Sequence, residues 1–189
     1  MSMSTSRMCL AVVLLWGLAS AAYGAPPVRE VVATQVMAAD TLRGHTLSLL
    51  ARGEVAEAID YWVLTTGKEA PSWLLALRTA FDVGKQEAGK CQGVARSIYT
   101  AFTQLRGKPE LVELRTRSAQ EVPYIMFKMV NGRDMNLSLN GYHLLVRMND
   151  RAYDAYTGAA GMPWAEYLSR LGAQSAITQK VVEVVTEAP

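Results

Sequence analysis

Gly89-Lys90-Cys91-Gln92-Gly93-Val94-Ala95-Arg96-Ser97-Ile98-Tyr99 is the stretch around which the rest of the chain can be arranged. Apolar side chains recur behind the cysteine at helical spacing, at Val94, Ile98, Phe102 and Leu105. The pattern predicts an amphipathic helix that begins at the cysteine. A thiol at a helix start faces unpaired backbone N–H groups, and Lys90 adds a positive charge. Both favour the thiolate, which is the nucleophilic form.

The N-terminus has the three-part pattern of a secretory signal peptide. A short polar segment containing Arg7 precedes the apolar run Cys9–Ser20, and small residues follow up to Gly24. The apolar run is too short to span a membrane. We therefore expect residues 1–24 to be a signal peptide and the protein to be secreted or periplasmic, with no stable membrane span after cleavage. The alternative is an uncleaved N-terminal anchor.

The cysteine count and the charge narrow the classes of function. Removal of 24 of the 189 residues leaves 165, and the loss of Arg7 lowers the net charge from +2 to +1. We expect no nucleic-acid binding, because the chain has no basic run. Cys9 leaves with the signal peptide, so Cys91 becomes the single thiol of an exported protein. Such a thiol is a reactive group, an intermolecular disulfide partner or a buried small hydrophobe.

The apolar pattern changes from helical to alternating along the chain, which predicts an α+β fold. We expect helices first and then a mostly antiparallel sheet, in one compact domain made of a helical N-terminal region, residues 25–85, and a second region, residues 86–189. The predicted helices cover residues 28–51, 54–64, 73–83, 91–105 and 164–171. The predicted strands cover residues 111–115, 122–130, 137–139, 142–148, 152–156 and 181–185.

Two histidines could act as the base that a thiol nucleophile needs near neutral pH. His45 lies inside the first predicted helix, and we interpret it as a surface or packing residue. His143 lies on a predicted strand. If Asn149-Asp150 forms a two-residue hairpin turn, Asp154 is a diagonal neighbour of His143 on the same face of the sheet. An aspartate there could bind one imidazole nitrogen and leave the other for the thiol.

Two assignments stay open at this point. A three-residue turn would move Asp154 to the other face of the sheet, with Asp150 as the fallback partner of the histidine. The side chain of Gln86, five positions before Cys91, could donate a hydrogen bond to an oxyanion, or it is an exposed loop residue. The backbone N–H of Cys91 is the other candidate donor.

Several motifs lie at characteristic places around these residues. Cys91 and Ala95 begin a helix, Leu137-Ser138-Leu139-Asn140-Gly141-Tyr142-His143 leads into a strand, Tyr153-Asp154 lies on the return, and Gly158–Trp164 (GAAGMPW) precedes a short helix. In these motifs the segment from Gly89 to Leu171 resembles the papain-fold toxin domains of bacterial polymorphic toxin systems. The resemblance implies a papain-like fold, a Cys91–His143–Asp154 triad and attack of the thiol on an amide.

The resulting hypothesis is an exported cysteine-dependent amide hydrolase, of the peptidase or glutamine deamidase type, that acts on a protein or peptide and could serve as a toxin or effector. The resemblance allows an immunity or inhibitor protein as a partner. We expect no cofactor and no metal site, because one cysteine and two histidines are a poor ligand set. The alternative is a non-enzymatic exported binding protein with a structural Cys91. The N-terminal helices could bind substrate, dock a partner or inhibit the enzyme.

Overall fold

The computed structural model describes residues 28–116 and 123–183. Four α-helices and a short 3-10 turn come first: α1 (Val28–Ala51), α2 (Val55–Thr66), α3 (Ser72–Ala80), η1 (Val83–Lys85) and α4 (Cys91–Gln104). The helix predicted to run to residue 83 ends at Ala80, because Asp82 takes extended backbone dihedrals and the chain then tightens into η1. The predicted signal peptide, residues 1–24, lies outside the described residues.

The rest of the described chain forms two antiparallel sheets and one more helix. The strands are β1 (Glu110–Arg115), β2 (Ile125–Lys128), β3 (Asp134–Ser138), β4 (Tyr142–Met148), β5 (Arg151–Tyr153), β6 (Met162–Pro163), β7 (Leu171–Gly172) and β8 (Thr178–Val182), with α5 (Trp164–Ser169) between β6 and β7. The larger sheet has the order β6-β5-β4-β1-β8 and the smaller one the order β3-β2-β7. The predicted α+β class, with helices first and an antiparallel sheet after them, is confirmed.

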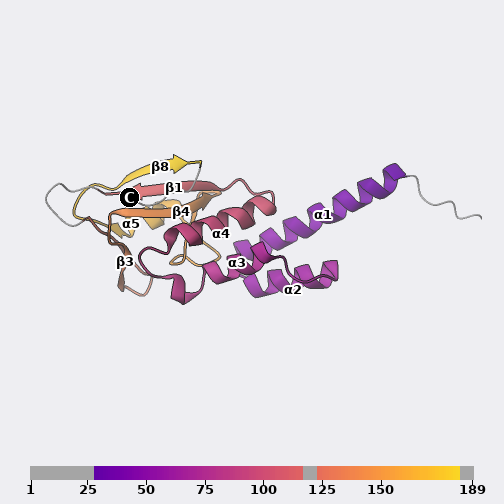
Figure 1. Ribbon diagram of the computed structural model, residues 1–189, viewed down its shortest axis with the longest axis horizontal. Coiled ribbons are helices and arrows are strands. Elements are labelled where there is room, and N and C mark those ends of the chain that lie inside the picture. The colour runs from indigo at the N-terminus through magenta and orange to yellow at the C-terminus, as the bar shows by residue number, and fades with distance from the viewer. Residues whose placement is uncertain (1–27, 117–122, 184–189) are drawn as a thin grey trace, which may run out of the picture.

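The helix that begins at Cys91 lies against the sheet, as Figure 1 shows for α4 and β4. Its buried face consists of the apolar residues Val94, Ala95, Ile98, Ala101 and Phe102. A fully buried side chain such as Ile98 contributes about 1.5–3 kcal/mol relative to an exposed one. The same helix contacts α3 on its other side, whereas α1 runs away from the sheet (Figure 1). This packing fixes the end of α4 that carries the thiol.

β4 is a central strand, hydrogen-bonded to β5 on one side and to β1 on the other. Gly141 precedes it with φ +70°, and a Cβ at this position would lie 2.5 Å from the carbonyl oxygen of Thr116. Only glycine fits there, because the backbone dihedral and the close approach both disfavour a side chain. The start of β4, and with it His143, is therefore fixed in position.

The hairpin between β4 and β5 forms as predicted. Met148 pairs with Arg151, and both turn residues have positive φ, 50° at Asn149 and 57° at Asp150. These values belong to the left-handed turn that matches the twist of two adjoining strands. The alternative three-residue turn is therefore wrong, and so is the fallback in which Asp150 is the partner of the histidine.

The strand after this turn is shorter than predicted. β5 ends at Tyr153 instead of continuing to residue 156, because the Asp154 carboxylate accepts hydrogen bonds from the backbone N–H groups of Tyr156 and Thr157. Such side chain–backbone bonds replace the ladder of a sheet by a turn. Asp154 therefore reaches His143 from the first residue after the strand.

Other predicted limits also differ from the structure. The helix predicted over 164–171 ends at Ser169, because Leu171 leaves it to pair with Phe127 of β2. The last strand covers Thr178–Val182 instead of residues 181–185; Glu183 is a bend, and residues 184 and 185 lie outside the described residues. None of the helices within residues 28–116 and 123–183 has the length and apolar content needed to cross a membrane.

Candidate active site

Cys91 is the first residue of α4 and is partly buried. Gly89, with φ +86°, turns the chain so that the helix can begin. Burial acts to raise the pKa of the thiol, but the neighbouring His143 and the backbone N–H groups of Leu144 and Gln92 outweigh it and hold the pKa below its ordinary value. These groups all stabilise negative charge on sulfur. The thiolate is therefore favoured at this position.

His143 is the second residue of β4, and its side chain is 1% exposed. Its Nε2 lies 3.1 Å from Oδ2 of Asp154, whereas the buried Nδ1 has no hydrogen-bond partner within residues 28–116 and 123–183. Because Asp154 occupies Nε2, Nδ1 is the nitrogen left for the thiol. Burial acts to lower the pKa of His143, but Asp154 and Cys91 together raise it to about 9.

The two opposite shifts favour one protonation state of the pair. The lowered pKa of Cys91 and the raised pKa of His143 both favour the pair of thiolate and imidazolium over the pair of neutral groups. An imidazolium beside a thiolate stabilises it and also carries the proton that a leaving group needs.

Asp154 is fixed by four hydrogen bonds. Oδ1 accepts from the backbone N–H groups of Tyr156 and Thr157, both at 2.9 Å, while Oδ2 accepts from His143 at 3.1 Å and from the hydroxyl of Tyr167 at 2.7 Å. Burial acts to raise the pKa of the carboxyl, but these partners, His143 first, keep it below its ordinary value. The side chain is therefore an ionised and immobilised acceptor, which holds the imidazole ring in one orientation.

Tyr167 is a member of this group that sequence reasoning missed. It lies on α5, is fully buried, and donates its hydroxyl hydrogen to Asp154. Burial and the adjacent carboxylate raise its pKa well above the ordinary value, so it remains a donor. One signal was available, because Tyr167 lies at helical spacing from Trp164 and Leu171, and a tyrosine on an apolar helix face needs a partner for its hydroxyl.

Gln86 follows η1 and is partly buried rather than an exposed loop residue. Its Nε2 donates to the backbone carbonyl of Ala155 at 2.9 Å, which joins the loop before Cys91 to the segment after Asp154. An amide nitrogen carries two hydrogens, so a second donor remains. Its role as an oxyanion donor stays a prediction.

A narrow hollow lies beside the thiol, with no room for a water-sized sphere. Tyr156 lines it and is held by a hydrogen bond from its hydroxyl to the carbonyl oxygen of Asn136 at 3.0 Å. Burial and the nearby acidic groups raise the pKa of Tyr156 to about 12. The hollow is lined by Lys85, Glu87, Cys91, Val94, His143, Asp154, Ala155 and Tyr156. It therefore brings Cys91, His143 and Asp154 together at one place.

The second histidine does not take part in this arrangement. His45 is exposed on α1, and its ring contacts that of Tyr61 with a centroid distance of 4.2 Å. The prediction of a surface or packing histidine is confirmed. Within the part of the chain that the structure describes, no three His, Cys, Asp or Glu side chains are grouped so that they could hold a metal ion.

The arrangement has the parts that a thiol nucleophile needs: a thiol at a helix start with a lowered pKa, an imidazole with a raised pKa and a buried carboxylate that orients the imidazole. Comparisons with protein-family models, with curated proteins and with solved structures found no match for this chain. The chemistry of these side chains is therefore the evidence from which a function can be inferred.

Proposed function

We propose that this protein is a cysteine-dependent amide hydrolase in which Cys91 is the nucleophile, His143 the acid and base, and Asp154 the residue that orients the histidine. One observation carries the proposal. The thiol and the imidazole shift each other's pKa in opposite directions, while Asp154 occupies the far nitrogen of the ring. A structural cysteine packed among apolar side chains would have a raised pKa.

The first half of the reaction forms an acyl-enzyme. The thiolate of Cys91 attacks the carbonyl carbon of a peptide or carboxamide, and the carbonyl π electrons move to oxygen. The backbone N–H of Cys91, with the second amide hydrogen of Gln86 as a further candidate, stabilises that oxyanion. When the tetrahedral intermediate collapses, His143 gives its proton to the leaving nitrogen. An amine or ammonia departs, and a thioester to Cys91 remains.

The second half regenerates the thiolate. His143, now neutral, removes a proton from water, and the resulting hydroxide attacks the thioester carbonyl. Collapse breaks the carbon–sulfur bond and releases a carboxylic acid, while His143 is again protonated. A peptidase and a glutamine deamidase share this sequence and differ only in the leaving nitrogen. In an acyl transferase, an amine would take the place of water as the nucleophile that attacks the thioester.

The proposal also includes the place where the protein acts, its target and its partner. The predicted signal peptide, residues 1–24, supports export and a secreted or periplasmic site of action. The motifs shared with papain-fold toxin domains support a role as a toxin or effector on a protein or peptide, with an inhibitor or immunity protein as its partner. The helical region before residue 86 contributes α3, which packs against the helix of Cys91.

The test measures the reactivity of the thiol in the full-length chain carrying Cys9→Ser, where Cys91 is the single thiol. Iodoacetamide should label folded Cys91 faster at pH 6–7 than it labels free cysteine, because the lowered pKa increases the thiolate fraction. In urea the advantage should vanish. Equal or slower labelling of the folded chain would contradict the proposal.

A substrate screen then tests hydrolysis itself. Mass spectrometry of a mixed peptide library distinguishes cleavage, which splits a peptide, from deamidation, which converts an amide to an acid. Cys91→Ser should lose turnover by about 10⁴-fold or more, as is typical when a nucleophile of such a site is removed. A matched control, His45→Gln, changes the exposed histidine of α1 and should retain full turnover.

A further inference from the structure

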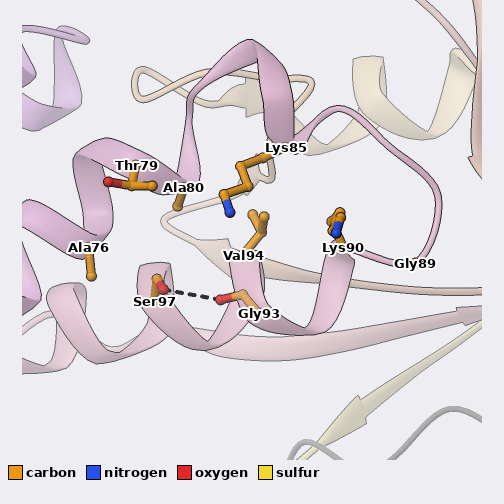
Figure 2. Close-up of a pocket in the computed structure, with 9 residues that line it drawn as sticks. All are labelled: Ala76, Thr79, Ala80, Lys85, Gly89, Lys90, Gly93, Val94 and Ser97. Carbon is orange, nitrogen blue, oxygen red and sulfur yellow. Dashed lines mark hydrogen bonds between the residues drawn. The ribbon is translucent and has the colours of Figure 1, made fainter.

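A groove of about 440 Å³ lies between α3 and the first turns of α4, the helix that begins with the thiol. Figure 2 shows it with its lining side chains. Small residues line most of it: Ala76, Ala80, Gly89, Gly93 and Ser97. Lys85 and Val94 line both this groove and the narrow hollow beside Cys91, so the two spaces adjoin. A volume of this size lies in the range of ligand-binding pockets.

The charged side chains of the groove are both positive. Lys85 and Lys90 line it together with no acidic residue, and Lys85 reaches between α3 and α4 beside Val94 (Figure 2). Within residues 28–116 and 123–183, no carboxylate lies within 4 Å of the ammonium group of either lysine. Several arginines in this part of the chain do form ion pairs with carboxylates. Glu87 lines the hollow beside the thiol and not the groove.

The remaining polar side chains of the groove are already occupied. The hydroxyl of Thr79 donates to the carbonyl of Leu75 at 3.1 Å, and that of Ser97 donates to the carbonyl of Gly93 at 3.1 Å (Figure 2). The donors left to a ligand are therefore the two ammonium groups. Lys85 is partly buried, which strengthens its attraction to an anion relative to a fully solvated lysine.

We infer that this groove is a substrate subsite for a carboxylate side chain, so that the enzyme prefers an acidic peptide whose Asp or Glu lies beside the amide presented to Cys91. The inference rests on the proposed function, since it assumes that the thiol attacks an amide. The carboxylate would form charge-assisted hydrogen bonds with Lys85 and Lys90. The small lining residues leave room for the side chain and for the peptide backbone that follows it.

The experiment compares electrophilic peptide probes on the full-length chain carrying Cys9→Ser. One probe places Glu next to a chloromethyl ketone, and a second has Gln at the same place, so that only the charge differs. Chloroacetamide, which has no peptide part, reports the reactivity of Cys91 alone. We expect the Glu probe to label Cys91 about tenfold faster than the Gln probe at low salt, in line with one or two charged hydrogen bonds. The preference should shrink at high salt.

Variants assign the preference to the groove. The double variant Lys85→Gln/Lys90→Gln should label equally with both probes, whereas Lys68→Gln, which removes an exposed lysine after α2, should keep the full ratio. The charge reversal Lys85→Glu/Lys90→Glu should favour a probe with Lys at that place. Circular dichroism confirms that each variant is folded. The ratio of the two probes is the readout, so a general change in thiol reactivity cancels.

The two proposals fail in different ways. Slow labelling by chloroacetamide would overturn the proposed function, whatever the peptide probes do. Fast labelling by chloroacetamide with equal rates for the Glu and Gln probes would overturn the acidic subsite alone. A Glu preference that survives in the double lysine variant would also overturn it, because the preference would then arise outside the groove.

Discussion

Two regions of this molecule each contain a histidine and an aspartate, but these residues are exposed in one region and buried in the other. On α1 and α2, His45 is exposed and lies against the ring of Tyr61, while Asp40 forms ion pairs with arginines at the surface. Between β4 and α5, His143 and Asp154 are buried and hydrogen-bonded to each other. Water can solvate the exposed residues even without a partner in the protein, whereas the buried residues can form hydrogen bonds only with other groups of the protein.

The difference explains why the buried region is the better candidate for a catalytic site. Burial strengthens the interaction between charges and makes an unpartnered polar atom costly. In the second region every oxygen of Asp154 is satisfied, so its orientation and charge are fixed. The pKa of His143 is therefore set by its neighbours rather than by solvent. Matched substitutions in the two regions test this contrast.

The largest effect is expected for Asp154→Asn, which removes the charge but keeps the shape. Turnover should fall about 10³–10⁴-fold, because the neutral amide no longer stabilises the imidazolium or fixes its tautomer. The pKa of His143 should fall from about 9, which NMR titration of the ring protons would detect. The matched variant Asp40→Asn removes a half-exposed carboxylate and should change stability by about 1 kcal/mol or less. An equal fall in turnover in the two variants would contradict the contrast between the two regions.

The pH dependence gives the next effect. The folded-state pKa of His143 is raised from 6.5 to about 9, so its ionised form contributes stability that is fully present below pH 6.5 and is lost as pH rises through about 9. The rate of hydrolysis should rise with pH as Cys91 ionises, and this rise should come at a lower pH than for an ordinary thiol. The rate should fall above about pH 9, where the imidazolium of His143 loses its proton. Rate profiles and urea unfolding from pH 5 to 10 measure both.

The two groups that raise the pKa of His143 are Asp154 after β5 and Cys91 on α4, and Tyr167 on α5 is hydrogen-bonded to Asp154. Lys85, Glu87 and Tyr156 line the same hollow as His143. In Asp154→Asn the alkaline limb should move to lower pH, whereas in His45→Gln it should stay in place. An alkaline limb that does not move in the first variant would assign it to another group.

The smallest effect is expected for Tyr167→Phe, which removes one of two donors to Oδ2 of Asp154. The free energy of unfolding should fall by about 1–3 kcal/mol, because a buried carboxylate loses a hydrogen bond. Turnover should fall less than in Asp154→Asn, since the bond to His143 is kept. Tyr61→Phe is the control, because it removes a tyrosine hydroxyl from α2 and keeps the ring that contacts His45. A variant as stable as the control would show that the hydroxyl of Tyr167 contributes little.

Local pattern is sufficient to predict much of this protein. The helical spacing after Cys91 predicts α4, and the two residues Asn149-Asp150 predict a tight hairpin, since a left-handed pair of dihedrals suits asparagine and aspartate. That hairpin in turn places Asp154 close to His143. These features depend on residues near one another in the chain, so a short stretch of sequence is enough to predict them.

Contacts between distant segments were decided by tertiary structure. The bond from Gln86 to Ala155 and the approach of Tyr167 to Asp154 join elements that are far apart in the sequence, and no local pattern indicates that they meet. Each forms because burial leaves a polar atom that must find a partner among the groups the packed core brings close. Cys91, His143 and Asp154 can therefore be named from the sequence, whereas Tyr167 and the pKa shifts of the group follow from the burial and the partners that only the assembled fold provides.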